Sequence, residues 1–138
     1  MRRTILLLTT VLALVALTAA LAVAAVGSGG EGADTITGTN SGDQIYGKGG
    51  GDAIYGRGGN DGISGGPGDD LVRGDDGNDT LVGGKGADRI QGGAGNDDIR
   101  PANDNASDFV NCGSGVDTVQ RTRGEARDTL VDCERVVY

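Results

Sequence analysis

Aspartates recur at every ninth residue through the middle of the chain, and carboxylates at such regular spacing can supply oxygen ligands to a hard cation. The chain has 138 residues, including 28 glycines and no histidine. The lack of histidine removes a common zinc ligand and the most common general base. These residue types therefore favour cation binding through oxygen over zinc coordination or acid–base catalysis. The periodic aspartates are Asp34, Asp43, Asp52, Asp61, Asp70, Asp79, Asp88 and Asp97.

These aspartates occupy position 6 of a nine-residue repeat that runs without a gap from residue 29 to residue 100, in eight copies. Position 1 is glycine in all eight copies, and position 4 is glycine in seven, with Ser41 as the exception. We expect the glycines to take positive φ angles in a tight turn, and residues such as Asn60 at position 5 to tolerate the same geometry. Position 8 is always aliphatic, as Ile36, Ile45, Ile54, Ile63, Val72, Leu81, Ile90 and Ile99.

Each repeat is long enough for one turn and one short strand at positions 7 to 9. Because side chains alternate along a strand, position 8 should point inward and positions 7 and 9 outward. Two repeats then complete a coil of 18 residues, and successive coils stack their strands about 4.7–4.9 Å apart. The sequence therefore predicts an all-β solenoid, in which two parallel sheets enclose a row of aliphatic side chains.

Stacking would place the aspartates in two ladders, one containing Asp34, Asp52, Asp70 and Asp88 and the other Asp43, Asp61, Asp79 and Asp97. Carboxylates about 5 Å apart repel by about 3 kcal/mol at an effective dielectric constant near 20. Calcium would relieve this repulsion better than magnesium, which requires a smaller octahedral shell and holds its water. Turn carbonyls would complete the shell, near Gly29, Gly47, Gly65 and Gly83 on one side and Gly38, Gly56, Gly74 and Gly92 on the other. The two ladders would bind several calcium ions. Because eight aliphatic residues make only a thin core, we also expect the chain to fold when calcium binds.

The repeat resembles the RTX, or haemolysin-type, calcium-binding nonapeptide G-G-x-G-x-D-x-U-x, in which U is a large aliphatic residue. Segments 29–37, 65–73, 83–91 and 92–100 match it at every specified position. The resemblance implies a right-handed parallel β-roll, with the position-6 aspartates and turn carbonyls as calcium ligands. Position 2 departs from glycine at Thr39, Lys48, Arg57 and Asp75, so we expect weaker sites there. The chain looks more like the small exported bacterial members than the toxins and proteases, whose activities are not carried over.

The first residues have the pattern of a secretory signal peptide. Arg2 and Arg3 precede an apolar stretch at residues 5–26, which contains the A-x-A motif ending at Ala24. We expect cleavage near Ala24, a short linker at residues 25–28, and secretion of the remaining chain. The alternative is an uncleaved transmembrane anchor, since this stretch is long enough to span a bilayer.

Residues 101–138 keep a fainter form of the repeat, with Asp108, Asp117 and Asp128 at position 6. We interpret them as degenerate closing coils that cap the open end of the solenoid. Cys112 and Cys133 are the two cysteines of the chain, and in an exported protein such a pair favours a disulfide that would staple this cap. The alternatives are metal binding by the two thiols and a separate partner-binding element.

The formal net charge of −8 disfavours nucleic acids and anionic membrane surfaces as partners, and after cleavage of the leader we expect no stable membrane insertion. The sequence contains no histidine and therefore no H-E-x-x-H motif. We therefore expect a secreted, non-catalytic calcium-binding module that acts outside the cell or at its surface. The alternatives are a calcium-dependent adhesin, a carbohydrate-binding module with a polysaccharide partner, or an accessory to an exported hydrolase.

Overall fold

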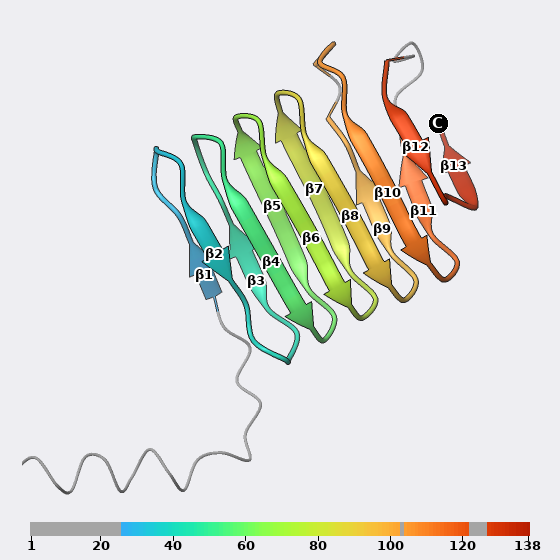
Figure 1. Cartoon of the computed structure of the whole chain (residues 1–138), viewed down its shortest axis with the longest axis horizontal. Coiled ribbons are helices and arrows are strands. Elements are labelled where there is room, and N and C mark those ends of the chain that lie inside the picture. The colour runs from blue at the N-terminus through green and yellow to red at the C-terminus, as the bar shows by residue number, and fades with distance from the viewer. Residues whose placement is uncertain (1–25, 103, 122–126) are drawn as a thin grey trace, which may run out of the picture.

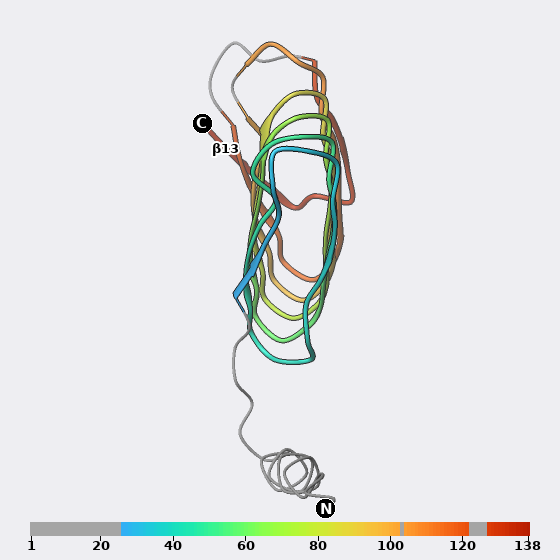
Figure 2. The same ribbon diagram turned by 90° about the vertical axis from the view of Figure 1, so that its left-hand side faces the viewer.

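The computed structural model describes residues 26–102, 104–121 and 127–138, so the predicted leader at residues 1–24 lies outside the described part of the chain. The described residues form a parallel β-solenoid of about six turns. Successive coils lie one behind another along the long axis (Figure 1). In the perpendicular view, the coils superimpose as flattened loops around a narrow interior (Figure 2). The predicted all-β solenoid is confirmed.

The strands alternate between two parallel sheets, because each coil contributes one strand to each wall. Neighbouring strands are offset by 18 residues through the repeats, so that Ile54 pairs with Val72. The offset is 20 residues between Ile90 and Val110, since Pro101 and Ala102 interrupt the repeat. One sheet contains, in spatial order, β1 (Val26–Ser28), β3 (Gln44–Tyr46), β5 (Gly62–Pro67), β7 (Thr80–Lys85), β9 (Asp98–Arg100), β11 (Thr118–Gln120) and β13 (Arg135–Val137). The other contains β2 (Thr35–Thr37), β4 (Ala53–Gly58), β6 (Leu71–Asp76), β8 (Arg89–Ala94), β10 (Phe109–Ser114) and β12 (Thr129–Val131).

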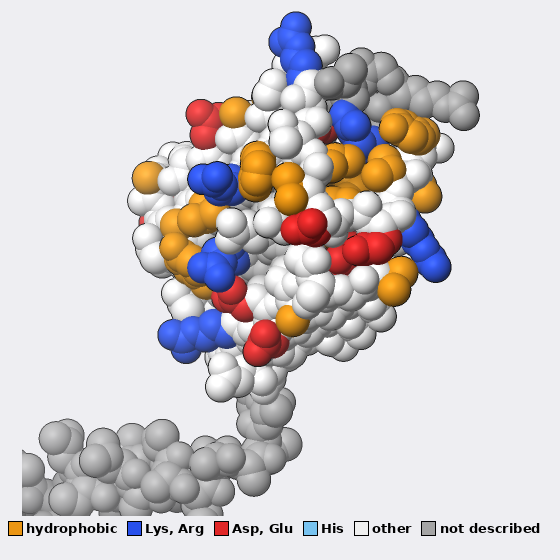
Figure 3. All heavy atoms as spheres, turned by 45° about the vertical axis from the view of Figure 1, so that its right-hand side comes forward, with side chains coloured by type: hydrophobic (Ala, Val, Ile, Leu, Met, Phe, Trp, Pro, Cys, Tyr) orange, Lys and Arg blue, Asp and Glu red, His pale blue; other side chains and the backbone are white. Residues whose placement is uncertain are grey.

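The core is the predicted row of position-8 side chains between the two sheets. Seven of the eight are at most 2% exposed, and the row continues into the tail with Val110 and Val119. Ile36, in the first coil, is only partly buried. Tyr46 and Tyr55 lie in different sheets, on β3 and β4. On the face seen in Figure 3, hydrophobic, acidic and basic side chains are interspersed among other polar side chains and backbone atoms.

The turns differ from the prediction at positions 1, 2 and 5. In the third to eighth repeats, positive φ angles occur at positions 2 and 4, as at Gly66 (113°) and Gly68 (142°), and not at position 1. Position 2 takes this geometry even where it is not glycine, at Lys48, Arg57 and Asp75. The glycine at position 1 is required for space instead, because a Cβ there would overlap neighbouring oxygen atoms.

The first coil has a different turn geometry from the coils that follow it. Neither its position-2 residues, Gly30 and Thr39, nor its position-4 residues, Gly32 and Ser41, have positive φ angles. Its strands β2 and β3 are three residues long, whereas β4 to β8 continue for six residues into positions 1 to 3. The end of the solenoid nearest the N-terminus is thus an atypical coil.

The tail continues both sheets. β10 and β12 extend one wall, β11 and β13 extend the other, and a disulfide joins Cys112 to Cys133 with their Cα atoms 5.2 Å apart. The predicted disulfide is therefore confirmed, and the alternative of two metal-binding thiols is wrong. In the part of the chain that the structure describes, no helix has the length and apolar character needed to cross a membrane.

Candidate functional site

The position-6 aspartates form two continuous ladders, each linked by one hydrogen bond per coil. In every rung, the backbone N–H of one aspartate donates to Oδ1 of the aspartate in the next coil, as Asp52 does to Asp70 at 2.7 Å. The rungs that link the eight repeat aspartates have N–O distances of 2.7–2.9 Å. The structure thus brings together all eight predicted site residues, in the two predicted sets of four.

The second carboxylate oxygen of most ladder aspartates is buried and has no hydrogen-bond donor. From Asp52 to Asp97 the position-6 side chains are at most 3% exposed. A buried charged oxygen without a partner is costly and requires an explanation. The Oδ2 atoms in this state belong to Asp52, Asp61, Asp70, Asp79, Asp88, Asp97 and Asp117.

The unpaired oxygens lie against the position-1 glycines of their own repeats. A Cβ placed on Gly65 would overlap both Oδ2 of Asp70 and the carbonyl oxygen of Gly83 in the next coil. The same pairing of a carboxylate oxygen and a backbone carbonyl recurs at Gly29, Gly38, Gly47, Gly56 and Gly74. Each such turn therefore gathers at least two oxygens, and glycine at position 1 allows them to approach the backbone this closely.

The electrostatic environment of the ladders opposes negative charge. The pKa values of Asp79 and Asp88 are raised from 3.8 to about 7, and that of Asp97 to about 6. Burial is the largest cause in each case, because a poorly solvated site disfavours the ionised carboxylate. The backbone hydrogen bond opposes the shift, and neighbouring carboxylates, such as Asp97 beside Asp79, reinforce it. A bound cation would reverse this balance.

The first coil satisfies its carboxylates by another route. The backbone N–H of Gly30 donates to Oδ2 of Asp34 at 2.6 Å, and Thr39 donates to Oδ2 of Asp43 from its backbone and its side chain. This follows from the different φ angles of that coil, which turn the position-2 N–H toward the carboxylate. Asp34 and Asp43 thus differ from the six repeat aspartates that follow them.

Position 5 forms a further ladder that the sequence did not predict. Asn60 Oδ1 accepts the N–H of Asn78, Asn78 Oδ1 accepts that of Asn96, and Asn96 Oδ1 accepts that of Val116, each at 2.8 Å. Asp69 accepts the N–H of Ala87 in the same way at 2.9 Å. None of these side chains is on a residue with positive φ. The preference for Asn and Asp at position 5 therefore reflects hydrogen bonding between coils.

The position-6 ladders also extend beyond the repeats, where sequence reasoning assigned no ligands. One continues from Asp88 to Asp108 at 2.9 Å and then to Asp128 at 3.2 Å. The other continues from Asp97 to Asp117 at 2.8 Å and ends on Oε2 of Glu134 at 3.0 Å. The phase of the three tail aspartates was visible in the sequence. Glu134 lies in no repeat, so no spacing signal could have identified it.

A cation at these ladders would depend on backbone oxygens as well as side chains. In the described ranges of the chain, no three His, Cys, Asp or Glu side chains gather at one point. The carboxylates are spread along the solenoid axis, so each gap between coils is bordered by two of them. Calcium takes six to eight oxygens, and the remaining ones would have to be turn carbonyls or water. The oxygen-rich, donor-poor turns fit such an ion.

Comparison with known families agrees with this geometry. The RTX calcium-binding nonapeptide repeat matches in four overlapping copies, at residues 28–63, 37–72, 64–99 and 73–107. No curated protein matches this chain. The matches together cover residues 28–107, more than half of the chain. The chain belongs to the family of RTX calcium-binding nonapeptide repeat proteins.

Proposed function

We propose that this protein binds several calcium ions between its stacked turns and that calcium binding drives the folding of the solenoid. The observation that carries the proposal is the series of buried Oδ2 atoms that no donor satisfies. An unpaired buried carboxylate destabilises the fold. A cation that contacts two such oxygens and the adjacent carbonyls would make these carboxylates stabilise the fold instead. The family of the repeat points to calcium as this cation.

The ligands in this proposal are the position-6 carboxylates together with the carbonyls near the position-1 glycines. Gaps from the second coil onward have the strongest support, since the carboxylates there have unpaired oxygens. Lys48, Arg57 and Asp75 take the same positive φ angle as the glycines at this position, which keeps the shape of the turn. Their effect on calcium affinity would therefore come through the conformational energy of these residues rather than a rebuilt site.

The proposed role is structural and extracellular, without catalysis. The signal-like residues 1–24 support export, and the disulfide between Cys112 and Cys133 suits an oxidising compartment. In this role the ladder carboxylates have no catalytic part. Each accepts a hydrogen bond from the backbone of the neighbouring coil and serves as a calcium ligand. A chain of this kind would stay unfolded where calcium is scarce and fold where it is abundant.

Circular dichroism of the full chain tests the proposal. The chain is first measured in EGTA and then in excess CaCl₂, with MgCl₂ as the comparison ion. We expect a largely unfolded spectrum in EGTA, a β-sheet spectrum in calcium, and a much smaller change in magnesium. Identical spectra in EGTA and calcium would contradict the proposal.

A further inference from the structure

The column of position-1 glycines ends at a cysteine. Cys112 occupies position 1 of the segment 112–120, and it is fully buried. In the preceding coils a side chain at this position would overlap the position-1 carbonyl of the next coil, as at Gly74 and Gly92. At Cys112 the side chain instead forms the disulfide to Cys133. The disulfide therefore takes the place of backbone stacking at the last turn of this column.

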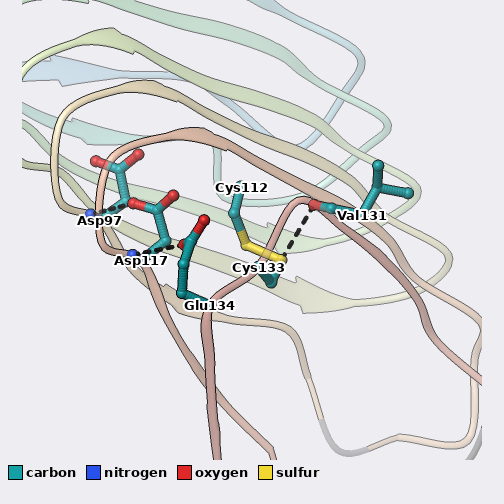
Figure 4. The surroundings of a disulfide bond; sticks show 6 residues. All are labelled: Asp97, Cys112, Asp117, Val131, Cys133 and Glu134. Atoms are coloured by element: carbon teal, nitrogen blue, oxygen red, sulfur yellow. Dashed lines mark hydrogen bonds between the residues drawn. A yellow bond between two sulfur atoms is a disulfide. The ribbon is translucent and has the colours of Figure 1, made fainter.

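The disulfide and the pairing of β13 with β11 together position the residue that follows Cys133. Glu134 comes directly after Cys133, and its Oε2 accepts the backbone N–H of Asp117 at 3.0 Å. This is the role that Oδ1 of the next aspartate plays in every earlier rung. Figure 4 shows the carboxylates of Asp97, Asp117 and Glu134 one after another, beside the disulfide.

Asp117 keeps the burial and the unpaired Oδ2 atom of the ladder aspartates, although Cys112 replaces the position-1 glycine of its turn. Its side chain is fully buried, and its Oδ2 atom has no hydrogen-bond partner. Gly113 and Gly115 have φ angles of 101° and 143°, close to 115° and 136° at Gly93 and Gly95 in the repeat before. The last turn thus has the same shape as the turns of the repeats.

The two ladders end differently. At the end of one, the guanidinium of Arg121 lies 3.2 Å from Oδ2 of Asp128, and this carboxylate is 1% exposed. The protein itself supplies the positive charge there. At the end of the other, no Lys or Arg among the described residues forms an ion pair with Asp117 or Glu134. Within the described ranges, that end of the ladder therefore has no ion-paired positive charge.

We propose that Asp117 and Glu134 form an additional calcium site outside the nonapeptide repeats, and that the Cys112–Cys133 disulfide assembles it by holding Glu134 beside the last turn. This inference rests on the proposed function, because it extends the same chemistry to a residue that lies in no repeat. Asp117 supplies a buried carboxylate and Glu134 an exposed one, and backbone carbonyls and water complete the calcium shell.

Calorimetric titration of the full chain with CaCl₂ tests the site, with Glu134→Gln as the variant and Asp132→Asn as its matched control. Asp132 is an exposed acid next to Cys133, and its φ of 51° is one that asparagine adopts readily. We expect Glu134→Gln to lose one bound ion, or to bind it at least about 10-fold more weakly. Asp132→Asn should match the wild type. The double variant Cys112→Ser, Cys133→Ser should show the same loss, and adding Glu134→Gln to it should remove nothing more.

Hydrogen exchange separates this inference from the proposed function and from misfolding. We expect calcium to protect residues 113–121 in the wild type but not in Glu134→Gln, while residues 47–100 are protected in both. If Glu134→Gln takes up calcium and protects residues 113–121 as Asp132→Asn does, the additional site is refuted. If calcium protects residues 47–100 in no variant, including the wild type, the proposed function fails and this inference fails with it.

Discussion

Replacing Asp79 with asparagine should have opposite effects with and without calcium. Asp79 lies in the middle of its ladder, between Asp61 and Asp97, and is 1% exposed. An asparagine keeps the Oδ1 atom that accepts the N–H of Asp61 at 2.8 Å. Its amide group would replace the unpaired Oδ2 atom and could donate to the nearby carbonyl of Gly92, which lies on the same side of Gly74.

The magnitude follows from the cost of ionising Asp79 in the calcium-free fold. Its pKa is raised from 3.8 to about 7, and one pKa unit corresponds to about 1.4 kcal/mol. At pH 8, Asp79→Asn should therefore stabilise the calcium-free fold by up to about 4 kcal/mol. With calcium present, the same change removes a carboxylate from the two gaps that Asp79 borders. The free energy gained from calcium binding should then fall.

The assay is circular dichroism at pH 8, combined with thermal unfolding, in EGTA and in excess CaCl₂. We expect Asp79→Asn to have more β-structure than the wild type in EGTA and a lower melting temperature in calcium. The control is Asp76→Asn, at an exposed acid of the same repeat, which should change little in either condition. If Asp79→Asn destabilises the protein under both conditions, or behaves as Asp76→Asn does, the ladder is not a calcium site.

Three further predictions concern pH and the turns. The folded-state pKa of Asp79 lies above its unfolded value, so the calcium-free fold binds more protons than the unfolded chain. Its stability should therefore rise as the pH falls from 8 to 5. A β-sheet dichroism signal in EGTA that weakens over this pH range would contradict this prediction. Gly65→Ala should destabilise the calcium-bound form by about 1–3 kcal/mol through overpacking, whereas Gly32→Ala, where a Cβ would meet nothing within 4 Å, should change it little in chemical denaturation. Lys48→Gly should raise the stability of the fold by about 1 kcal/mol, because glycine adopts the positive φ of 81° at this position without strain. Lys85 has no positive φ, so a similar gain from Lys85→Gly would refute that explanation.

The repeat predicted most of the fold because each of its positions is subject to one dominant constraint. A period of nine with an aliphatic residue at position 8 allows a single inward row, and the structure buries that row from Ile45 to Val119. The ladders of Asp34 and Asp43 follow from the same period, since residues 18 apart must stack in a two-repeat coil. Local pattern and global packing agree throughout this region, which is why periodicity alone was sufficient.

The details that were missed depend on contacts between coils. The glycine at position 1 was attributed to φ, but at Gly65 the cause is the proximity of Asp70 and of the next coil. Asn60 was likewise attributed to turn geometry, but it accepts a hydrogen bond from Asn78, 18 residues away. The residue type at one position does not show whether that residue is needed for its own φ angle or for a contact with the neighbouring coil.

The end of the second ladder could not be predicted for a related reason. Glu134 reaches Asp117 next to the disulfide and at the start of the pairing between β13 and β11, and its offset of 17 residues does not match the period. The sequence did indicate the disulfide, through the isolated pair of cysteines, but not which acidic residue it would bring to the ladder.

The most direct test of the central claim is a calorimetric titration of the calcium-free chain with CaCl₂, followed by the same titration with MgCl₂. We predict uptake of several calcium ions per chain, accompanied by the large heat of a folding transition, and little uptake of magnesium. A chain that took up no calcium, or that bound it without any change in structure, would contradict the claim that the aspartate ladders are calcium sites on which the fold depends.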